Sequence, residues 1–144
     1  MGGTTDGRDV GVTHNMPRRH GAVILPMSGA VGAQYTPAAG YAQAIQYRAM
    51  NEPEWRGAIA VALGGDGSVA ANGFWAALNI VTTLRLPFLF FIEDNNYGIS
   101  VPSSLQTPEG NIAANLASFK NLKIIEADGT DPKEASEAIN KAVT

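Results

Sequence analysis

Two short polar stretches could together bind a metal ion and a phosphate group. Residues 64–68 (GGDGS) follow the apolar run 58–63, and residues 94–97 (DNNY) follow the apolar run 88–92. Glycines allow the backbone to approach a phosphate closely, and a helix that begins behind them offers free N–H groups. The first stretch therefore has the composition of a phosphate-binding turn.

Asp66 changes what this turn can bind, because its carboxylate occupies the place expected for the phosphate. Two unit charges about 4 Å apart repel by about 4 kcal/mol at an effective dielectric constant of about 20. A divalent cation between them converts the repulsion into attraction, and Mg²⁺ is usually held by one or two protein groups together with substrate phosphates. An amide oxygen and a backbone carbonyl from residues 94–97 can add to such a ligand set. The two stretches predict a magnesium diphosphate site.

A strand, a helix and a second strand must position these two turns. The runs 58–63 and 88–92 suit strands that are buried on both faces. Pro87 ends the helix between them, because its ring cannot continue the hydrogen-bond ladder. A right-handed strand–helix–strand unit lays its strands parallel, so both turns should lie at the carboxyl edge of the sheet, where ligands of open α/β sheets bind. The apolar residues at helical spacing are Phe74, Trp75, Ala77, Leu78, Ile80, Val81 and Leu84.

The rest of the chain extends this pattern to an α/β fold with a mostly parallel sheet flanked by helices. Short apolar runs predict strands over residues 23–27 and 122–126. A helix is expected from about Pro37 to Ala49, since proline is tolerated in a first helical turn. One or two helical turns are expected over residues 112–119.

The sequence predicts a helix at the C-terminal end of the chain and a loop at the N-terminal end. Asp131 as N-cap, Pro132 in the first helical position and Glu134 three residues after the cap form a capping box that predicts a final helix. Residues 1–22 have no periodicity of two or 3.6 and are expected to form a loop or flexible arm. The arm contains the two histidines; their spacing alone makes neither a ligand nor a base.

Composition excludes several classes of function. A chain of 144 residues with 45% hydrophobic and 16% charged residues is typical of one globular domain. A net charge of −3 without a basic run argues against a nucleic-acid surface. The absence of cysteine excludes disulfides and thiolate metal sites. No apolar run approaches the roughly 20 residues of a membrane span, and no signal-peptide pattern is present, so we expect a cytoplasmic protein.

Several motifs in a fixed order resemble a known family of enzymes. They are GAVGAQYTPAAG, GGDGS, ALN, RLP and EDNNYGISVP, spread over roughly residues 14–132. Together they resemble the alpha subunit of the decarboxylating first component of 2-oxo acid dehydrogenase complexes, which act on pyruvate or branched-chain substrates with thiamine diphosphate and Mg²⁺. The resemblance implies a thiamine diphosphate-binding fold. It also implies that residues 1–144 are the diphosphate-binding domain, cut at both ends.

The same resemblance implies a role for particular residues. Asp66, the side chain of Asn95 and the carbonyl of Tyr97 would hold the metal ion. In this family Asp94 is usually an asparagine, so this turn departs from the pattern. The residues that would contact the coenzyme, in addition to Asn95, are Gly65, Gly67, Ser68, Gly98 and Ile99 at the diphosphate and thiazolium end, and Gly29 and Val31 through their backbone at the aminopyrimidine.

The resemblance also implies partners and a reaction. A beta subunit would supply the glutamate that starts the chemistry, in a heterotetramer, with a homo-oligomer as the alternative assembly. A lipoyl-bearing acyltransferase would accept the acyl group after oxidative decarboxylation of a small 2-oxo acid. We assign no catalytic side chain to this chain, which we expect to be inactive alone. Pyruvate, branched-chain 2-oxo acids and acetoin all remain possible substrates.

Two other interpretations stay open at this point. Gly65, Gly67 and Ala70 match the G-x-G-x-x-A pattern of a nicotinamide-binding oxidoreductase domain, with Glu93 as the ribose-binding acid. The carboxylate of Asp66 inside the loop argues against it. The second interpretation is a non-catalytic fragment that assembles with a partner through the strongly apolar helix.

Overall fold

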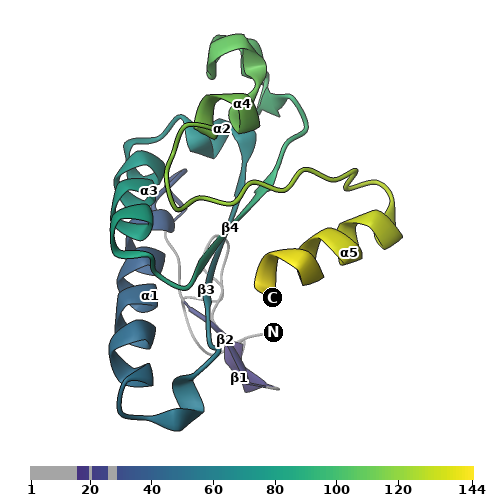
Figure 1. Ribbon diagram of the computed structural model, residues 1–144. Helices are drawn as coiled ribbons and strands as arrows, with labels where there is room; N and C mark the ends of the chain where they lie inside the picture. Colours follow the sequence, from purple (N-terminus) through teal and green to yellow (C-terminus); the bar gives the residue numbers. More distant parts are fainter. Residues whose placement is uncertain (1–15, 20, 26–28) are drawn as a thin grey trace, which may run out of the picture.

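A two-stranded parallel sheet organises the part of the chain that the computed structural model describes, residues 16–19, 21–25 and 29–144. Its strands are β3 (Ala60–Gly65) and β4 (Phe88–Glu93). Helices α1 (Tyr35–Ala49) and α3 (Asn72–Leu84) lie together on one side of it, and α5 (Pro132–Val143) lies on the other (Figure 1). The molecule is therefore a small α/β domain.

The pairing of β3 with β4 brings the two polar turns to one edge. The strands are parallel, in a register that runs from Ala60 opposite Phe88 to Gly65 opposite Glu93. Because α3 connects them in a strand–helix–strand unit, both carboxyl ends point the same way. The sequence-based prediction of parallel strands with both turns at their carboxyl edge is confirmed.

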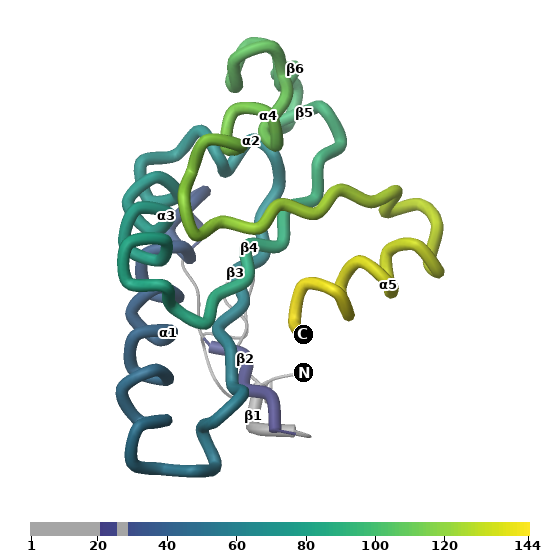
Figure 2. The backbone as a smooth tube through the Cα atoms, viewed as in Figure 1, coloured from purple at the N-terminus to yellow at the C-terminus, as the bar shows by residue number. Residues whose placement is uncertain are grey.

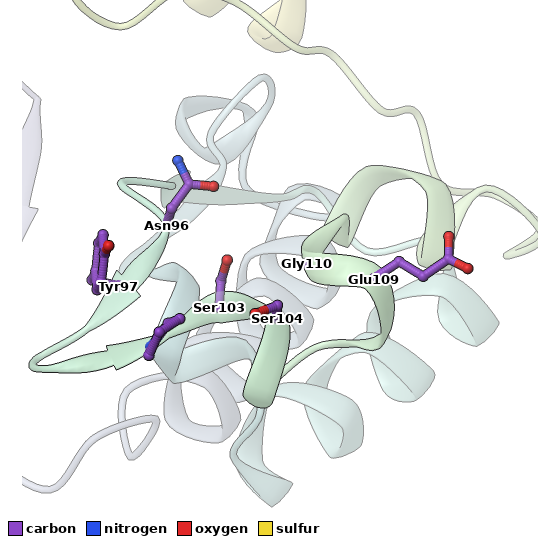
Figure 3. A pocket seen from close by; sticks show the side chains of 7 residues that line it. Asn96, Tyr97, Ser103, Ser104, Glu109 and Gly110 are labelled. Atoms are coloured by element: carbon purple, nitrogen blue, oxygen red, sulfur yellow. The ribbon is translucent and has the colours of Figure 1, made fainter.

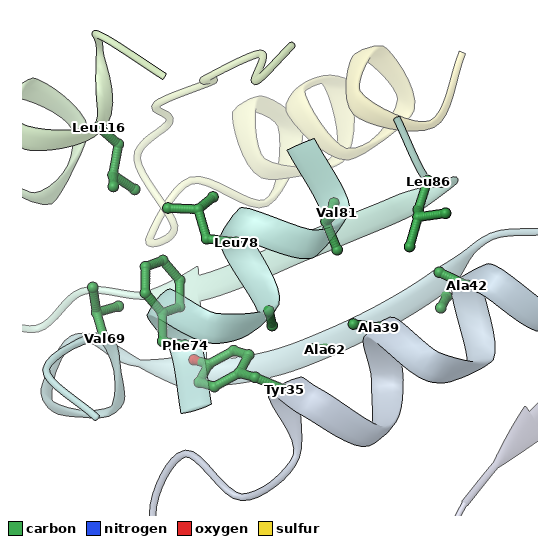
Figure 4. Close-up of a cluster of buried hydrophobic side chains, with 12 residues drawn as sticks. Tyr35, Ala39, Ala42, Ala62, Val69, Phe74, Leu78, Val81, Leu86 and Leu116 are labelled. Carbon is green, nitrogen blue, oxygen red and sulfur yellow. The ribbon is translucent and has the colours of Figure 1, made fainter. Parts of the chain in front are cut away.

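The hydrophobic core lies between the sheet and the pair α1 and α3 (Figure 4). Tyr35 and Phe74 are fully buried or nearly so, and their rings meet edge to face with centroids 5.2 Å apart. Small residues on α1 let that helix approach the sheet closely, because Ala39 and Ala42 are completely or almost completely buried. The core thus fixes the start of α1 against the end of β3, next to the Asp66 turn.

The remaining elements of the described chain are short. Figure 2 shows that the hairpin of β5 and β6 lies beyond the end of β4. The predicted short helix is present as α4. The remaining elements are β1 (Met16–Arg19), β2 (Ala22–Ile24), η2 (Pro53–Trp55), α2 (Asp66–Val69), β5 (Tyr97–Gly98), β6 (Val101–Pro102), η3 (Ser103–Leu105), η4 (Pro108–Gly110) and α4 (Ile112–Leu116).

The prediction of a third strand over residues 122–126 is wrong. This segment pairs with none of the described strands, although Leu122 packs against the core. An apolar run can bury side chains without forming a ladder, and a strand needs a neighbour for its backbone groups. The expectation of a mostly parallel sheet holds for β3 and β4 alone, since the other two described strand pairs are antiparallel.

The helical segments also differ in detail from expectation. α1 begins at Tyr35 rather than near Pro37. The helix expected after GGDGS is divided into α2 and α3, because Ala71 has an extended backbone with ψ of 144°. Met16–Arg19, within the stretch expected to be a loop, forms β1. The other residues of the expected arm, apart from 21 and 22, lie outside the described residues, and so do His14 and His20.

Within the described residues, strand β3 is covered on one face and open on the other, although α5 lies on that side of the sheet (Figure 1). Ala60 and Ala62 of β3 are buried, whereas Val61 and Leu63 are 48% and 65% exposed. The expectation of burial on both faces is therefore wrong for β3, because α1 and α3 pack on the same side. Among the described residues, no helix combines the length and apolar character that a membrane crossing requires.

The start of α5 follows the predicted capping pattern in part. The Asp131 carboxylate accepts hydrogen bonds from the backbone N–H groups of Lys133 and Glu134. The Glu134 carboxylate accepts from the N–H of Asp128, not from that of the N-cap residue. Asp131 is thus the N-cap, and Glu134 ties the preceding turn to the helix instead of closing a capping box.

Candidate metal and diphosphate site

Among the described residues, the Asp66 carboxylate stands out because it is buried and one of its oxygens is unpaired. Asp66 is the first residue of α2 and only 2% exposed. Its Oδ2 atom is buried and has no hydrogen-bond partner among the described residues. Burying a carboxylate oxygen without a partner is unfavourable, and native structures rarely tolerate it without a compensating group. A cation or a hydrogen-bond donor would satisfy such an oxygen.

A tyrosine and a serine hold the backbone of this turn from the core side. The Ser68 hydroxyl donates to the carbonyl of Gly65 at 2.6 Å, and the Tyr35 hydroxyl lies 2.5 Å from Ser68 Oγ. Because a hydroxyl has one hydrogen, Tyr35 is the donor to Ser68. A Cβ on Gly64 would collide with the Tyr35 hydroxyl and with Ser68 Oγ. Ser68 therefore uses its side chain to shape the turn, and only its backbone N–H is left for a diphosphate.

Burial also extends the pH range over which Tyr35 stays protonated. Desolvation raises the pKa of the Tyr35 phenol above its ordinary value, and the hydrogen bond with Ser68 lowers it by less. A raised pKa keeps the hydroxyl protonated, which is the state that can donate. The phenol is protonated at neutral pH even at its ordinary pKa, and the raised pKa extends this donor state further into the alkaline range.

The second turn, residues 94–97, is exposed and held by its own side chains. Asp94 Oδ1 accepts from the N–H of Asn96, and Asn95 Oδ1 accepts from the N–H of Tyr97, both at 2.9 Å. Asn96 takes a positive φ of 66°, which asparagine tolerates better than most residues. An amide oxygen has a second lone pair, so Asn95 Oδ1 can accept a further partner.

The hairpin geometry leaves the Tyr97 carbonyl free of the ladder. Tyr97 lies opposite Pro102 in the antiparallel pair of β5 and β6. The N–H of Ser103 donates to the carbonyl of Asn96 at 2.9 Å. That bond makes Tyr97 and Pro102 a non-hydrogen-bonded pair, in which the carbonyl of each residue points away from the partner strand. The Tyr97 carbonyl is therefore directed away from β6.

The two turns are in direct contact through glycines. A Cβ on Gly67 would lie 2.9 Å from Gly98 Cα, a separation that no real side chain would tolerate. Asp66 and Tyr97 are the immediate neighbours of these glycines in sequence, so they belong to the two segments that meet here. Because Gly67 has no side chain, it leaves room for Gly98. This is a second reason for glycine at this position, in addition to the close approach to a phosphate.

The remaining predicted contacts lie at different places around the turns. Val31 is 68% exposed in the loop before α1, and Gly29 is exposed as well. A Cβ on the nearby Gly32 would lie 2.5 Å from Ala71 Cβ, so this loop packs against the junction of α2 and α3. Ile99 is 98% exposed in the loop joining β5 to β6 and does not line the contact between the turns.

Comparison with known proteins decides the family. The family model for the dehydrogenase E1 component matches residues 2–144. The chain belongs to the dehydrogenase E1 component family. It is 33% identical over 112 residues to a protein of Staphylococcus aureus strain Mu50 named pyruvate dehydrogenase E1 component subunit alpha, and 34% identical over 101 residues to a protein of the same name from Staphylococcus epidermidis strain ATCC 12228.

These matches cover most of this E1-family chain but little of each relative. They include 78% of the chain and 28% of the S. aureus protein, and 70% of the chain and 25% of the S. epidermidis protein. The chain thus spans about a quarter of the length of these relatives. The matches support the alpha-subunit resemblance and give no support to the nicotinamide-binding interpretation of Gly65, Gly67 and Ala70.

At this edge the described part of the E1-family chain offers one buried carboxylate, that of Asp66. Among residues 16–19, 21–25 and 29–144, no group of three or more His, Cys, Asp and Glu side chains could hold a metal ion. A cation at Asp66 would therefore need amide, carbonyl and phosphate oxygens as its other ligands, which suits Mg²⁺.

A shallow hollow lies beside the site rather than in it (Figure 3). Its volume is about 240 Å³, and its lining includes neither Asp66 nor Asn95. It opens between the β5–β6 hairpin and the η3 and η4 turns. Its lining residues are Asn96, Tyr97, Pro102, Ser103, Ser104, Glu109 and Gly110.

Sequence reasoning missed two residues that shape the site. Tyr35 appears in the sequence as an ordinary residue at the start of a helix, and only its burial against Ser68 reveals its role. Gln106 lies in a polar stretch without periodicity, but its side chain reaches the contact between the two turns. The glycines at 64, 67 and 98 were the available signal, since each marks a place where a neighbour needs the space.

Proposed function

We propose that this chain binds thiamine diphosphate through Mg²⁺, as the coenzyme-anchoring part of the alpha subunit of a 2-oxo acid dehydrogenase first component. The observation that carries the proposal is the buried Oδ2 atom of Asp66, which has no hydrogen-bond partner among the described residues. It lies at the carboxyl edge of a parallel sheet, where α/β folds bind ligands.

The residues present fit a magnesium diphosphate. Asp66 supplies the carboxylate, Asn95 an amide oxygen with a lone pair to spare, and Tyr97 a carbonyl that points away from its ladder. The backbone N–H groups of Gly67 and Ser68, in the first turn of α2, lack partners within that helix and are available to phosphate oxygens. The protein thus offers oxygen ligands to the metal and N–H donors to the diphosphate.

The names of the relatives point to the reaction. Two of them are called pyruvate dehydrogenase E1 component subunit alpha, so we propose oxidative decarboxylation of a small 2-oxo acid with acyl transfer to a lipoyl-bearing acyltransferase. Thiamine diphosphate, when bound, supplies the electron sink for cleavage of the bond to the carboxylate. The residues of this chain bind and orient the diphosphate, and we propose that a beta subunit completes the active site.

Thermal unfolding of the 144-residue chain tests the coenzyme proposal. A ligand at 100 times its Kd stabilises a protein by about 2.7 kcal/mol, which raises the Tm of a domain of this size by roughly 5–10 °C. We expect that rise only when thiamine diphosphate and Mg²⁺ are both present. Thiamine without the diphosphate, and thiamine diphosphate with EDTA, are the controls and should give no shift.

The same titration can contradict the proposal in two ways. A Tm that does not move with coenzyme and Mg²⁺ together would argue for the non-catalytic interpretation. An equal rise in Tm with and without Mg²⁺ would contradict the proposal that Mg²⁺ joins the Asp66 carboxylate to the diphosphate.

The catalytic part of the proposal has its own measurement. We expect the chain alone, saturated with coenzyme and Mg²⁺, to release no CO₂ from pyruvate or branched-chain 2-oxo acids, because the described residues include no assigned acid or base. Decarboxylation by the purified chain alone would show that the beta subunit is not needed.

A further inference from the structure

The side chain of Gln106 fills the corner between the two turns of the candidate site. A Cβ on Gly98 would lie 2.6 Å from Gln106 Oε1 and 2.7 Å from Nε2. A Cβ on Gly67 would lie 3.1 Å from the same Oε1 atom. The carboxamide therefore occupies the space that side chains at both glycines would need, one from each turn.

Hydrogen bonds fix Gln106 in that corner. Its Nε2 atom donates to the carbonyl of Val101 in β6 at 2.9 Å. Its backbone N–H donates to the carbonyl of Ser103, whose own N–H donates to Asn96, each at 2.9 Å. Gln106 is thus attached to β6 through its side chain and to the residue before β5 through Ser103. With Nε2 committed to Val101, the Oε1 atom faces Gly67 and Gly98.

We propose that Gln106 is a positioning residue of the coenzyme site, which sets the separation between the Asp66 turn and the Tyr97 turn. The inference rests on the proposed function, because it concerns the geometry that Mg²⁺ requires. Gly67 follows Asp66 and Gly98 follows Tyr97, so a change at the contact between the glycines moves both metal ligands. Mg²⁺ demands near-ideal octahedral geometry, and small displacements of its ligands weaken binding.

Four chains test the positioning role of Gln106: wild type, Gln106→Ala, Gly98→Ala and the double variant. Each is measured for ligand-free Tm and for its apparent affinity for Mg²⁺ with thiamine diphosphate present. Gln106→Ala should weaken the Mg²⁺-dependent affinity about tenfold, the upper range for one lost hydrogen bond, with little change in ligand-free Tm. Gly98→Ala should weaken it more, because the new Cβ displaces the carboxamide.

The double variant separates positioning from a general loss of structure. Removing the Gln106 side chain makes room for the Cβ of Gly98→Ala, so the double variant should bind better and unfold at a higher temperature than Gly98→Ala alone. Gln46→Ala is the matched control, since Gln46 Nε2 also donates to backbone carbonyls, those of Leu84 and Arg85, away from the site. It should leave Mg²⁺ affinity unchanged.

The outcomes distinguish this inference from the proposed function. If the wild type binds coenzyme with Mg²⁺ and Gln106→Ala binds equally well, or if the two substitutions are additive, the positioning role is overturned. If the wild type shows no response to coenzyme and Mg²⁺, the proposed function fails and the positioning role with it. The ligand-free Tm values then still decide whether Gln106 and Gly98 are in contact, because only a contact gives recovery in the double variant.

Discussion

The two turns that meet at the sheet edge are built in opposite ways. Asp66 is 2% exposed, and its turn is held from the core by Tyr35 and Ser68. Asn95 is exposed, and its turn is held by its own side chains and by the hairpin beyond it. One proposed ligand is therefore fixed by the core, and the other by local hydrogen bonds that solvent can reach.

Because of this difference, the polar group of the first turn should lower the stability of the ligand-free chain, whereas that of the second turn should not. A buried carboxylate oxygen without a partner opposes folding in the absence of a cation, whereas an exposed amide in a local turn does not. Functional sites often retain such unfavourable groups because the ligand compensates them. The two turns should therefore respond differently to the loss of their polar groups.

The largest effect is expected from Asp66→Asn. A neutral amide of the same shape removes the buried charge, so the ligand-free chain should unfold at a higher temperature. The affinity for coenzyme and Mg²⁺ should fall at least about 100-fold, which corresponds to the loss of one charge-assisted contact. Thermal unfolding with and without ligand measures both. Asp94→Asn is the matched control, because Asp94 is exposed and should change neither value much. A ligand-free chain destabilised by Asp66→Asn would contradict this account of the first turn.

A smaller loss is expected from Asn95→Ala. Losing one neutral oxygen ligand should weaken Mg²⁺ about tenfold, while the ligand-free chain loses about 0.5–1.5 kcal/mol with its hydrogen bond to the Tyr97 N–H. Calorimetric titration of Mg²⁺ in the presence of coenzyme measures the affinity. Asn96→Gly keeps the positive φ and serves as the control. Equal effects of the two substitutions would mean that Asn95 acts only on the shape of the turn.

Tyr35→Phe tests whether the core side holds the first turn. The variant keeps the ring in place but removes the donor to Ser68, so it should lower the free energy of unfolding by about 1–2 kcal/mol and weaken coenzyme binding several-fold. Tyr47→Phe is the control, because Tyr47 is 69% exposed. Chemical denaturation measures the free energy. A chain with unchanged stability and binding would show that Ser68 maintains the turn through Gly65 alone.

The smallest effect is a dependence of stability on alkaline pH. Burial raises the pKa of Tyr35 in the folded chain above its ordinary value of 10.0. The folded state therefore binds this proton more tightly, and the contribution to stability is complete below about pH 10 and is lost as the pH rises through the raised pKa. Denaturation at a series of pH values, with Tyr35→Phe as reference, measures the difference. Identical curves for both chains would exclude the effect.

The sequence determined the frame of the site because its signals are local. Apolar runs, the helical spacing of residues such as Phe74 and Leu78, and the polar residues after each run are enough to predict a parallel strand–helix–strand unit. The same reasoning placed Asp66 and Asn95 at one edge of the sheet. It failed over residues 122–126, where an apolar run has no neighbouring strand, and on the open face of β3 at Val61 and Leu63.

Only the tertiary structure decided how the site is held. The unpaired oxygen of Asp66, the commitment of Ser68 to Tyr35, and the place of Gln106 between two glycines depend on residues that are distant in sequence. A hydroxyl or amide carries no local signal of its partner, because hydrogen bonds depend on distance and direction in space. Residue types and spacing therefore identified the turns, and packing alone settled which of their atoms remain free to bind.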